Sequence, residues 1–365
     1  MYRILTINPG STSTKVSVFE DDKEVFNKNV AHKKEELDRF DSLSEQKDYR
    51  KQVIIESLKE NNTDLDCFDA VVGRGGGLLA MEGGVYGVNE IMLEHARIGA
   101  NGVQHPANLG SLLAHDFAEE FKCHAYVVNP PDTDELQAVA RLTGVKGVYR
   151  NVHLHALNLK ETALHHCRKY GIRYEDKNFI VCHLGGGISI SAHQKGKMID
   201  GNDIVGGEGP MTPTRCGSVP VLEVSNYLKD HDSKELKKLC QKNGGFLSLL
   251  GTNDALEVSE KASAGDKKAK LAWDTMAYQI EKWIGAMSAV LKGDVDGILI
   301  SGGIAYNKDL IDEIERSCGY IAQVFNYPGE FEMNAMASGA IRVLDHQETV
   351  KEYTGIKCWS EKELI

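Results

Sequence analysis

Apolar and polar residues alternate along two stretches that lie about half a chain apart. In residues 3–20, alternation on either side of a turn at residues 9–10 predicts a β-hairpin with a hydroxyl-rich bend. Residues 179–192 repeat the pattern, with three glycines at 185–187 in the bend. Two similar hairpins in one chain suggest a duplicated unit.

A longer period marks the predicted helices. Residues 271–292 place apolar side chains at three- and four-residue steps, which predicts a core-packed helix that ends at Gly293. Helical stretches are also expected within 107–121 and 153–170. The polar segment 259–270 is expected to be an exposed helix or a solvated connection, because it has few large apolar residues.

Glycines also follow a predicted strand near the C-terminus. The apolar run 295–301 predicts a buried strand that ends in Gly302 and Gly303, where another backbone or a flat ligand can approach closely. Backbone amides in tight glycine turns bind anions without any cation. Two such bends favour the binding of a nucleotide polyphosphate, although a single glycine hairpin is more often only a turn.

Length and composition narrow the function classes. A chain of 365 residues with 42% hydrophobic residues predicts a globular protein of two domains. The net charge of −11 disfavours nucleic acid and anionic membranes as partners. The eight cysteines include no CxxC pair, so we expect free thiols in a reducing compartment. With no signal-peptide core and no run of 18 apolar residues, the expected location is cytoplasmic.

Common nucleotide-binding signatures are missing from the sequence. It has no GxxxxGK followed by Ser or Thr, no GxGxxG after a strand and no HRD loop. The motifs therefore do not support a P-loop protein, a Rossmann dehydrogenase or a protein kinase.

Seven other motifs occur in one characteristic order. They are INPGSTSTK at 7–15, VGRGG at 72–76, HALN at 155–158, HLGGGISI at 183–190, GPMTPTR at 209–215, GTNDA at 251–255 and SGGIAYN at 301–307. Together they resemble the acetokinase family of the sugar kinase, Hsp70 and actin superfamily, and within it the butyrate kinases. The resemblance implies an α/β fold of two duplicated actin-like ATPase domains, each a mixed β-sheet flanked by helices, with an active-site cleft between them. It places one domain at 1–150 plus about 338–365 and the other at 151–337.

The implied reaction transfers the γ-phosphoryl group of ATP to butanoate or a branched short-chain acid, giving ADP and an acyl phosphate, reversibly and in line. A carboxylate, with an ordinary pKa near 4, is ionised at neutral pH and needs no general base. Catalysis then requires positioning and charge neutralisation. The resemblance further implies ATP or ADP with Mg²⁺ as cofactors, and a homo-oligomer, a dimer or larger.

The resemblance also assigns candidate residues. The catalytic candidates are Arg74, His155 and Arg215. The nucleotide-binding candidates are Asn8, Ser11, Ser13 and Lys15 in the first hairpin, His183, Gly185 and Gly187 in the second, and Asp254, Gly302, Gly303 and Asn307 for the nucleoside. The metal candidates are Glu332 and Asn129.

Simpler roles compete with some of these assignments. An arginine beside glycines is more often part of a surface ion pair, and Ser13 and Lys15 can face solvent. His153 takes the role of His155 if the register slips by two. The cluster His153, His155, His165 and His166 lacks the HExxH or cysteine partner expected of zinc.

Three departures from the family pattern stand out. Asn129 occupies a position where the family has an aspartate that helps to place Mg²⁺, with Asp132 and Asp134 as substitutes. Leu256 replaces an arginine that stacks on the adenine. The histidine of QHPAN is displaced by one position, so Gln104 or His105 is expected in the acid pocket.

Two rival functions remain open at this level. A sugar or polyol kinase of the same superfamily would use a catalytic aspartate, for which Asp200 and Asp203 are candidates. A catalytically impaired nucleotide-binding homologue is the other, because of the departures at Asn129 and Leu256.

Overall fold

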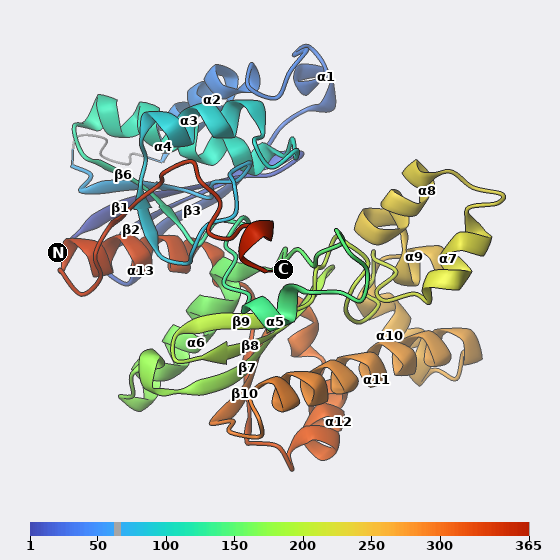
Figure 1. Ribbon diagram of the computed structural model, residues 1–365. Helices are drawn as coiled ribbons and strands as arrows, with labels where there is room; N and C mark the ends of the chain where they lie inside the picture. The colour runs from blue at the N-terminus through green and yellow to red at the C-terminus, as the bar shows by residue number, and fades with distance from the viewer. Residues whose placement is uncertain (62–66, 365) are drawn as a thin grey trace. The chain divides into compact units, whose positions relative to one another are not determined.

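A computed structural model describes residues 1–61 and 67–364. The chain divides into two compact units, the N-terminal unit (1–134 with 331–363) and the C-terminal unit (135–330). Each contains one mixed β-sheet flanked by helices (Figure 1). The expected α/β class with two sheets is confirmed. The domain limits near residues 150 and 338 that the family resemblance implies stay a prediction.

The N-terminal unit has a seven-stranded sheet in the order β12-β5-β6-β4-β1-β2-β3. Strands β1, β2 and β3 form an antiparallel meander, and β4 and β6 continue the sheet in parallel with β1. The strands are β1 (Arg3–Pro9), β2 (Ser13–Glu20), β3 (Lys23–Ala31), β4 (Ala70–Gly73), β5 (Val85–Gly87), β6 (His124–Val128) and β12 (Lys351–Glu352). The helices are α1 (Lys34–Leu37), α2 (Gln46–Glu60), α3 (Glu90–Ile98), α4 (Leu109–Phe121) and α13 (Glu332–Leu344), with 3₁₀ turns at Pro106–Asn108 and Glu361–Glu363.

Helices cover both faces of this sheet (Figure 1). Apolar residues of β1, β2 and β4 pack against α2 and α4. Helix α13 lies so close to β6 that a Cβ atom on Gly339 would be 2.7 Å from Val128. The C-terminal helix therefore completes the N-terminal unit and brings Glu332 to it.

The C-terminal unit has a five-stranded sheet in the order β11-β10-β7-β8-β9. Strands β7, β8 and β9 form a second antiparallel meander, and β10 is parallel to β7 and β11. The strands are β7 (Asn178–Leu184), β8 (Ile188–Gln194), β9 (Lys197–Gly201), β10 (Gly297–Gly302) and β11 (Val324–Pro328). The helices are α5 (Ala138–Arg141), α6 (Ala156–Tyr170), α7 (Val221–Tyr227), α8 (Ser233–Lys238), α9 (Gly245–Leu250), α10 (Ala255–Ser263), α11 (Lys267–Val290) and α12 (Lys308–Cys318). Short turns lie at Tyr174–Asp176, Leu239–Asn243 (a π-helical turn) and Gly303–Tyr306.

Strand alternation divides the core of this unit into two layers. Ile180 and Cys182 of β7 belong to the core that α11 and α12 cover. Phe179 points to the opposite side, where it meets His166 of α6. Successive side chains of a strand face opposite sides of a sheet, so two helical layers enclose β7 and β10.

The predicted elements compare well with those observed. The hairpins at 3–20 and 179–192 are β1–β2 and β7–β8, and the long amphipathic helix is α11. The polar segment 259–270 contains the end of α10 and the start of α11, whose first turn is capped by the side chain of Asp266. None of the helices within residues 1–61 and 67–364 combines the length and the apolar character of a membrane-spanning helix.

Candidate active site

The first bend joins β1 to β2 and is supported from inside the N-terminal unit. The Gly10 amide donates to the Ser13 carbonyl at 2.7 Å, which closes the turn. Arg50 of α2 is completely buried, and its Nη1 donates to the carbonyls of Gly10 (3.0 Å) and Ser13 (3.3 Å) and to the hydroxyl of Thr14 (3.0 Å). Burial lowers the pKa of Arg50 to about 10. No motif in the sequence pointed to Arg50.

Of the residues predicted in this first bend, Asn8 makes the contact that matters most. Its Nδ2 donates to Oε2 of Glu332 at 2.8 Å, which joins the end of β1 to the start of α13. Ser11 is exposed, and Ser13 and Lys15 are half-buried.

Arg74 follows β4 and is buried, with 8% of its side chain exposed. Its Nε lies 3.8 Å from Oε1 of Glu332, and its Nη1 donates to the Asn129 carbonyl at 3.4 Å. Burial lowers the pKa of Arg74, and the nearby carboxylates of Glu332 and Asp132 oppose this shift. The structure therefore brings four predicted residues, Asn8, Arg74, Asn129 and Glu332, into one polar cluster.

Glycines fix the position of Arg74. A Cβ atom on Gly73 would lie 2.0 Å from the Gly110 carbonyl oxygen, and one on Gly110 would lie 2.7 Å from the Arg74 amide. Strand β4 and helix α4 consequently approach to backbone contact, which only glycine permits. Desolvation and, next, the Arg74 guanidinium lower the pKa of His105, so His105 rather than Gln104 is electrostatically linked to Arg74. Gln104 instead donates to the Ile98 carbonyl.

The two predicted metal residues differ in what their side chains already bind. Asn129 has a φ of +38°, a conformation that asparagine tolerates, and its Oδ1 accepts a hydrogen bond from the Gly84 amide at 2.8 Å. Glu332 accepts one hydrogen bond from Asn8, and a carboxylate has about four acceptor positions. Glu332 therefore fits a magnesium ion held mainly by phosphates and water better than Asn129 does. Within residues 1–61 and 67–364, no three His, Cys, Asp or Glu side chains gather as a metal-binding group.

The second bend joins β7 to β8 in the C-terminal unit. The Gly185 amide donates to the Gly187 carbonyl at 3.1 Å. His183 is the second-last residue of β7. The centroid of its ring lies 4.2 Å from that of His155. The Nδ1 of His155 is hydrogen-bonded at 2.8 Å to the hydroxyl of Ser189 on β8. Both predicted histidines thus lie beside the bend.

Arg215 lies directly against this bend. A Cβ atom on Gly187 would be 1.7 Å from Nη1 of Arg215, so no other residue type fits at 187 while the arginine stays in place. Nη1 is buried and has no hydrogen-bond partner among the described residues, while Nε donates to the Gln241 carbonyl at 3.2 Å. Burial lowers the pKa of Arg215, and Asp203 opposes the shift.

The loop before Arg215 is fastened to the bend by hydroxyl groups. Thr212 and Thr214 each donate to the Gly186 carbonyl, at 2.7 and 2.9 Å. Their hydrogen bonds occupy the bend's carbonyl oxygen, a group that would repel an anion. The loop therefore presents the guanidinium beside the glycine backbone.

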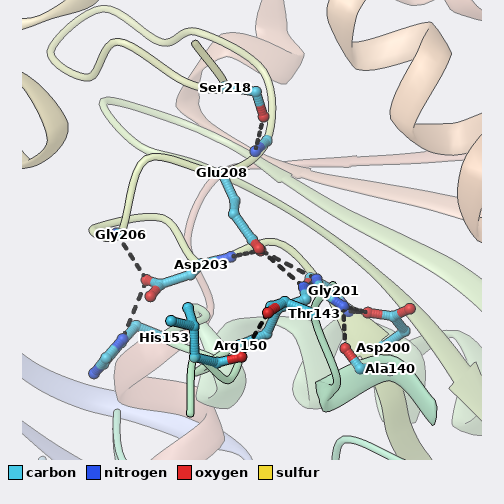
Figure 2. A network of polar contacts seen from close by, with 12 residues as sticks. Ala140, Thr143, Arg150, His153, Asp200, Gly201, Asp203, Gly206, Glu208 and Ser218 are labelled. Carbon is cyan, nitrogen blue, oxygen red and sulfur yellow. Dashed lines mark hydrogen bonds and ion pairs between the residues drawn. The ribbon is translucent and has the colours of Figure 1, made fainter. Parts of the chain in front are cut away.

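A network around Arg150 holds the neighbouring loop (Figure 2). Its guanidinium donates to both carboxylate oxygens of Glu208, at 2.9 and 3.1 Å, and to Asp200 at 3.0 Å. Burial lowers the pKa of Arg150, but hydrogen bonds to Glu208 and Asp200 outweigh it and raise the pKa above its ordinary value. No sequence motif pointed to Arg150.

Asp203 belongs to the same region and is also engaged (Figure 2). It accepts from the amides of Val205 and Gly206 at 3.0 Å and pairs with Nδ1 of His153 at 3.1 Å. Both aspartates proposed for a sugar kinase, Asp200 and Asp203, thus stabilise a loop.

A cavity of about 660 Å³ extends from the second bend. Its lining includes Gly185 and Gly186 of the bend and the predicted nucleoside residues Asp254, Gly303 and Asn307. Asp254 and Asn307 also cap α10 and α12 through hydrogen bonds to backbone amides. Gly302, with a φ of +97°, packs on the Leu184 backbone and is not itself part of the lining.

Leu256 lines this cavity and is 65% exposed. The aliphatic side chain of Leu256 and the Trp273 ring line the same cavity and give it an apolar wall, where the resemblance implies an arginine in the family. A larger cavity of about 800 Å³ lies among α10, α11 and α12 but includes none of the bend residues.

Comparison with known proteins decides the family. The model described as the acetokinase family matches residues 150–348. Butyrate kinase 1 of Clostridium acetobutylicum is 42% identical over 355 residues, covering 97% of this chain and all of that protein. A probable butyrate kinase of Clostridium botulinum is 43% identical over 354 residues, covering 96% and 99%.

The chain belongs to the acetokinase family. The resemblance drawn from the seven motifs is therefore confirmed. Among solved structures, the acetate kinase of Porphyromonas gingivalis superposes with a TM-score of 0.74 at 18% identity, covering 94% of this chain and all of that one. This likeness confirms the actin-like fold that the family resemblance implies.

Proposed function

We propose that this acetokinase family member phosphorylates a short-chain carboxylate, with butanoate as the leading substrate, converting ATP and the acid reversibly to ADP and an acyl phosphate. The observation that carries the proposal is the 42% sequence identity to a butyrate kinase, which extends over 97% of this chain. The contact between Arg215 and Gly187, beside a nucleotide-sized cavity, supports it with a physical mechanism.

The nucleotide is proposed to bind in the C-terminal unit. The phosphates would meet the amides of the second bend and the free N–H groups of Arg215 Nη1, because turn amides and a guanidinium both suit phosphate oxygens. The nucleoside would occupy the cavity lined by Asp254 and Asn307, with Leu256 on the apolar wall. His183 and His155 would border the transferring group.

The acid substrate needs neutralisation rather than deprotonation. Butanoate is already a carboxylate at neutral pH, so the reaction has no use for an aspartate base. The engagement of Asp200 and Asp203 in loop hydrogen bonds agrees with this requirement and speaks against a sugar kinase. Arg74 is proposed to bind the acid carboxylate and Arg215 the transferring phosphoryl oxygens.

Magnesium is proposed as the second cofactor. Glu332, with Asn8 and Arg74 holding its two oxygens, is the residue of this chain that would contact the ion or its water shell. The ion supplies charge neutralisation on the phosphates when bound. Asn8 and Arg74 fix the orientation of that carboxylate whether or not the ion is present.

A panel of acceptors tests the proposal. With MgATP and hydroxylamine, we expect butanoate and isobutanoate to give trapped hydroxamate, and glucose to give no ADP above background. Arg74→Ala or Arg215→Ala should lower the rate with the best acid by about 10²-fold or more. Turnover with glucose alone, or an unchanged rate in both variants, would refute the assignment.

The wider properties expected of the protein are part of the same proposal. We propose a homo-oligomer, a dimer or larger, that acts in the cytoplasm on small molecules. Nucleic acid and anionic membranes are not proposed as partners, because the net charge of −11 disfavours them. Light scattering on the eluting protein tests the subunit number, and a mass equal to one chain would contradict it.

A further inference from the structure

Two cysteines lie side by side next to Arg215. Cys216 directly follows Arg215 in the chain, and its Sγ is 3.8 Å from Sγ of Cys240. Both residues are half-buried, so a small reagent can reach them. Neither cysteine is among the described residues that line the cavity at the second bend, so the proposed nucleotide site does not use them.

The backbone keeps the two thiols adjacent. The Cys216 amide donates to the Leu239 carbonyl at 3.0 Å, and the Gly244 amide donates to the Thr214 carbonyl at 2.9 Å. A Cβ atom on Gly244 would lie 2.3 Å from the Cys216 amide, so the two segments touch through glycine. The pair is therefore fixed by the same backbone contacts that hold the loop of Arg215.

The two sulfurs are chemically different. The thiol of Cys216 donates toward Cys240 and lowers the pKa of Cys240 to about 7, while burial and Asp203 oppose this shift. Burial raises the pKa of Cys123, Cys167 and Cys318 to about 11. The thiolate is the reactive form of cysteine, so Cys240 is the favoured nucleophile.

We propose that Cys216 and Cys240 form an oxidation-sensitive dithiol whose closure to a disulfide displaces the Arg215 loop and slows the kinase reaction. The second half of this statement rests on the proposed function. The sulfurs must approach from 3.8 Å to about 2.05 Å, which draws the segments that carry Cys216 and Cys240 together. The Nε of Arg215 donates to Gln241, the neighbour of Cys240, so both ends of the movement reach the guanidinium.

A hydroperoxide is the oxidant that the chemistry requires. The Cys240 thiolate attacks one oxygen of hydrogen peroxide, the O–O bond breaks, hydroxide leaves, and a sulfenic acid forms. The Cys216 sulfur then attacks the Cys240 sulfur; the S–S bond forms, the S–O bond breaks, and the hydroxyl leaves as water with the Cys216 proton. In sum, two thiols lose two electrons and two protons, and one peroxide becomes two waters.

Peptide mapping tests the site without any assay of activity. The full chain is treated with hydrogen peroxide, blocked with iodoacetamide and digested with trypsin without reduction. We expect residues 216–229 linked to residues 239–242, and loss of this product on reduction. Cys216→Ser should leave Cys240 as a sulfenic acid that dimedone traps, and Cys240→Ser should leave Cys216 unoxidised. The matched control Cys67→Ser, which removes an exposed thiol, should still form the link.

Absence of the linked peptide, or preferential dimedone labelling of Cys67 in the wild-type chain, would overturn the dithiol. Its coupling to Arg215 is read separately. The oxidised protein should turn over at least about tenfold more slowly, because small displacements of a positioning group carry such costs, and dithiothreitol should restore the rate. Equal rates before and after complete closure would overturn the coupling. A reduced protein without acid kinase activity would instead refute the proposed function and leave the mapping result standing.

Discussion

The guanidinium of Arg215 occupies the space that any side chain at position 187 would need, with Nη1 1.7 Å from the position of a Cβ on Gly187. The HLGGGISI motif at 183–190 and the GPMTPTR motif at 209–215 are therefore in direct contact. It also explains why the bend requires glycine at 187 for a reason other than backbone conformation, since Gly187 has no positive φ.

Gly187→Ala should therefore act through Arg215. The methyl group must push the guanidinium aside, so we expect kcat to fall by about 10²-fold while the midpoint of thermal unfolding changes by a few degrees at most. The matched control is Gly186→Ala, because a Cβ there meets nothing within 4 Å. Steady-state kinetics and thermal unfolding of both variants check this. Equal losses at 186 and 187 would mean that the clash with Arg215 is not the cause.

Arg50 should support the first bend from inside the fold. Arg50→Met leaves the carbonyls of Gly10 and Ser13 without their buried donor, and we expect a loss of stability on the order of 3 kcal/mol. The KM for ATP should rise if the bend loosens. Urea unfolding and kinetics test this against Arg39→Met, which removes an exposed arginine. A variant as stable as the control would show that the buried guanidinium is dispensable.

Acid should destabilise the C-terminal unit through His166. Burial, together with smaller contributions from the positive charges of Lys169 and His165, lowers the pKa of His166 from 6.5 to about 4. The unfolded chain binds this proton near pH 6.5 and the folded chain only near pH 4, so stability is lost as the pH falls through this interval. The expected contribution is on the order of 2 kcal/mol.

Urea unfolding at several pH values measures this effect. His166→Asn keeps a polar atom that can bind the Tyr327 hydroxyl. Its free energy of unfolding should fall less between pH 6.5 and pH 4 than that of the wild type. The exposed His124→Gln serves as the control. Parallel pH profiles for the wild type and His166→Asn would exclude His166 as a source of the acid sensitivity.

Asn129→Asp tests the departure at the metal position. An aspartate can keep the hydrogen bond from the Gly84 amide and add a negative charge beside Glu332 and Arg74. We expect half-maximal activity at a lower Mg²⁺ concentration, measured at fixed total ATP. An identical Mg²⁺ titration would place residue 129 outside the metal sphere.

Much of the fold follows from local pattern. The sequence predicted β7, β8 and α11, because the burial of side chains follows the periodicity of the backbone. The two strands are buried on both faces, and α11 is buried on one. The start of α6 at Ala156 could not be predicted from the sequence, because contacts of His153 with Asp203 and of His155 with Ser189 fix the non-helical residues before it.

The candidate site shows the same division. Motifs identified Arg74, Arg215 and the glycine bends, whose residue types carry the chemistry themselves. Arg50 and Arg150 could not be predicted from motifs, because they stabilise their loops through hydrogen bonds to partners such as Thr14 and Glu208, which lie 36 and 58 positions away in the chain. Likewise, the pairing of Asn8 with Glu332 across 324 positions cannot be read from local sequence.

A crystal structure with butanoate and a non-hydrolysable ATP analogue tests the central claim most directly. The account predicts phosphate oxygens within about 3.2 Å of the amides at 185–187 and of Nη1 of Arg215. A triphosphate bound elsewhere, with that guanidinium nitrogen still without an anionic partner, would contradict it.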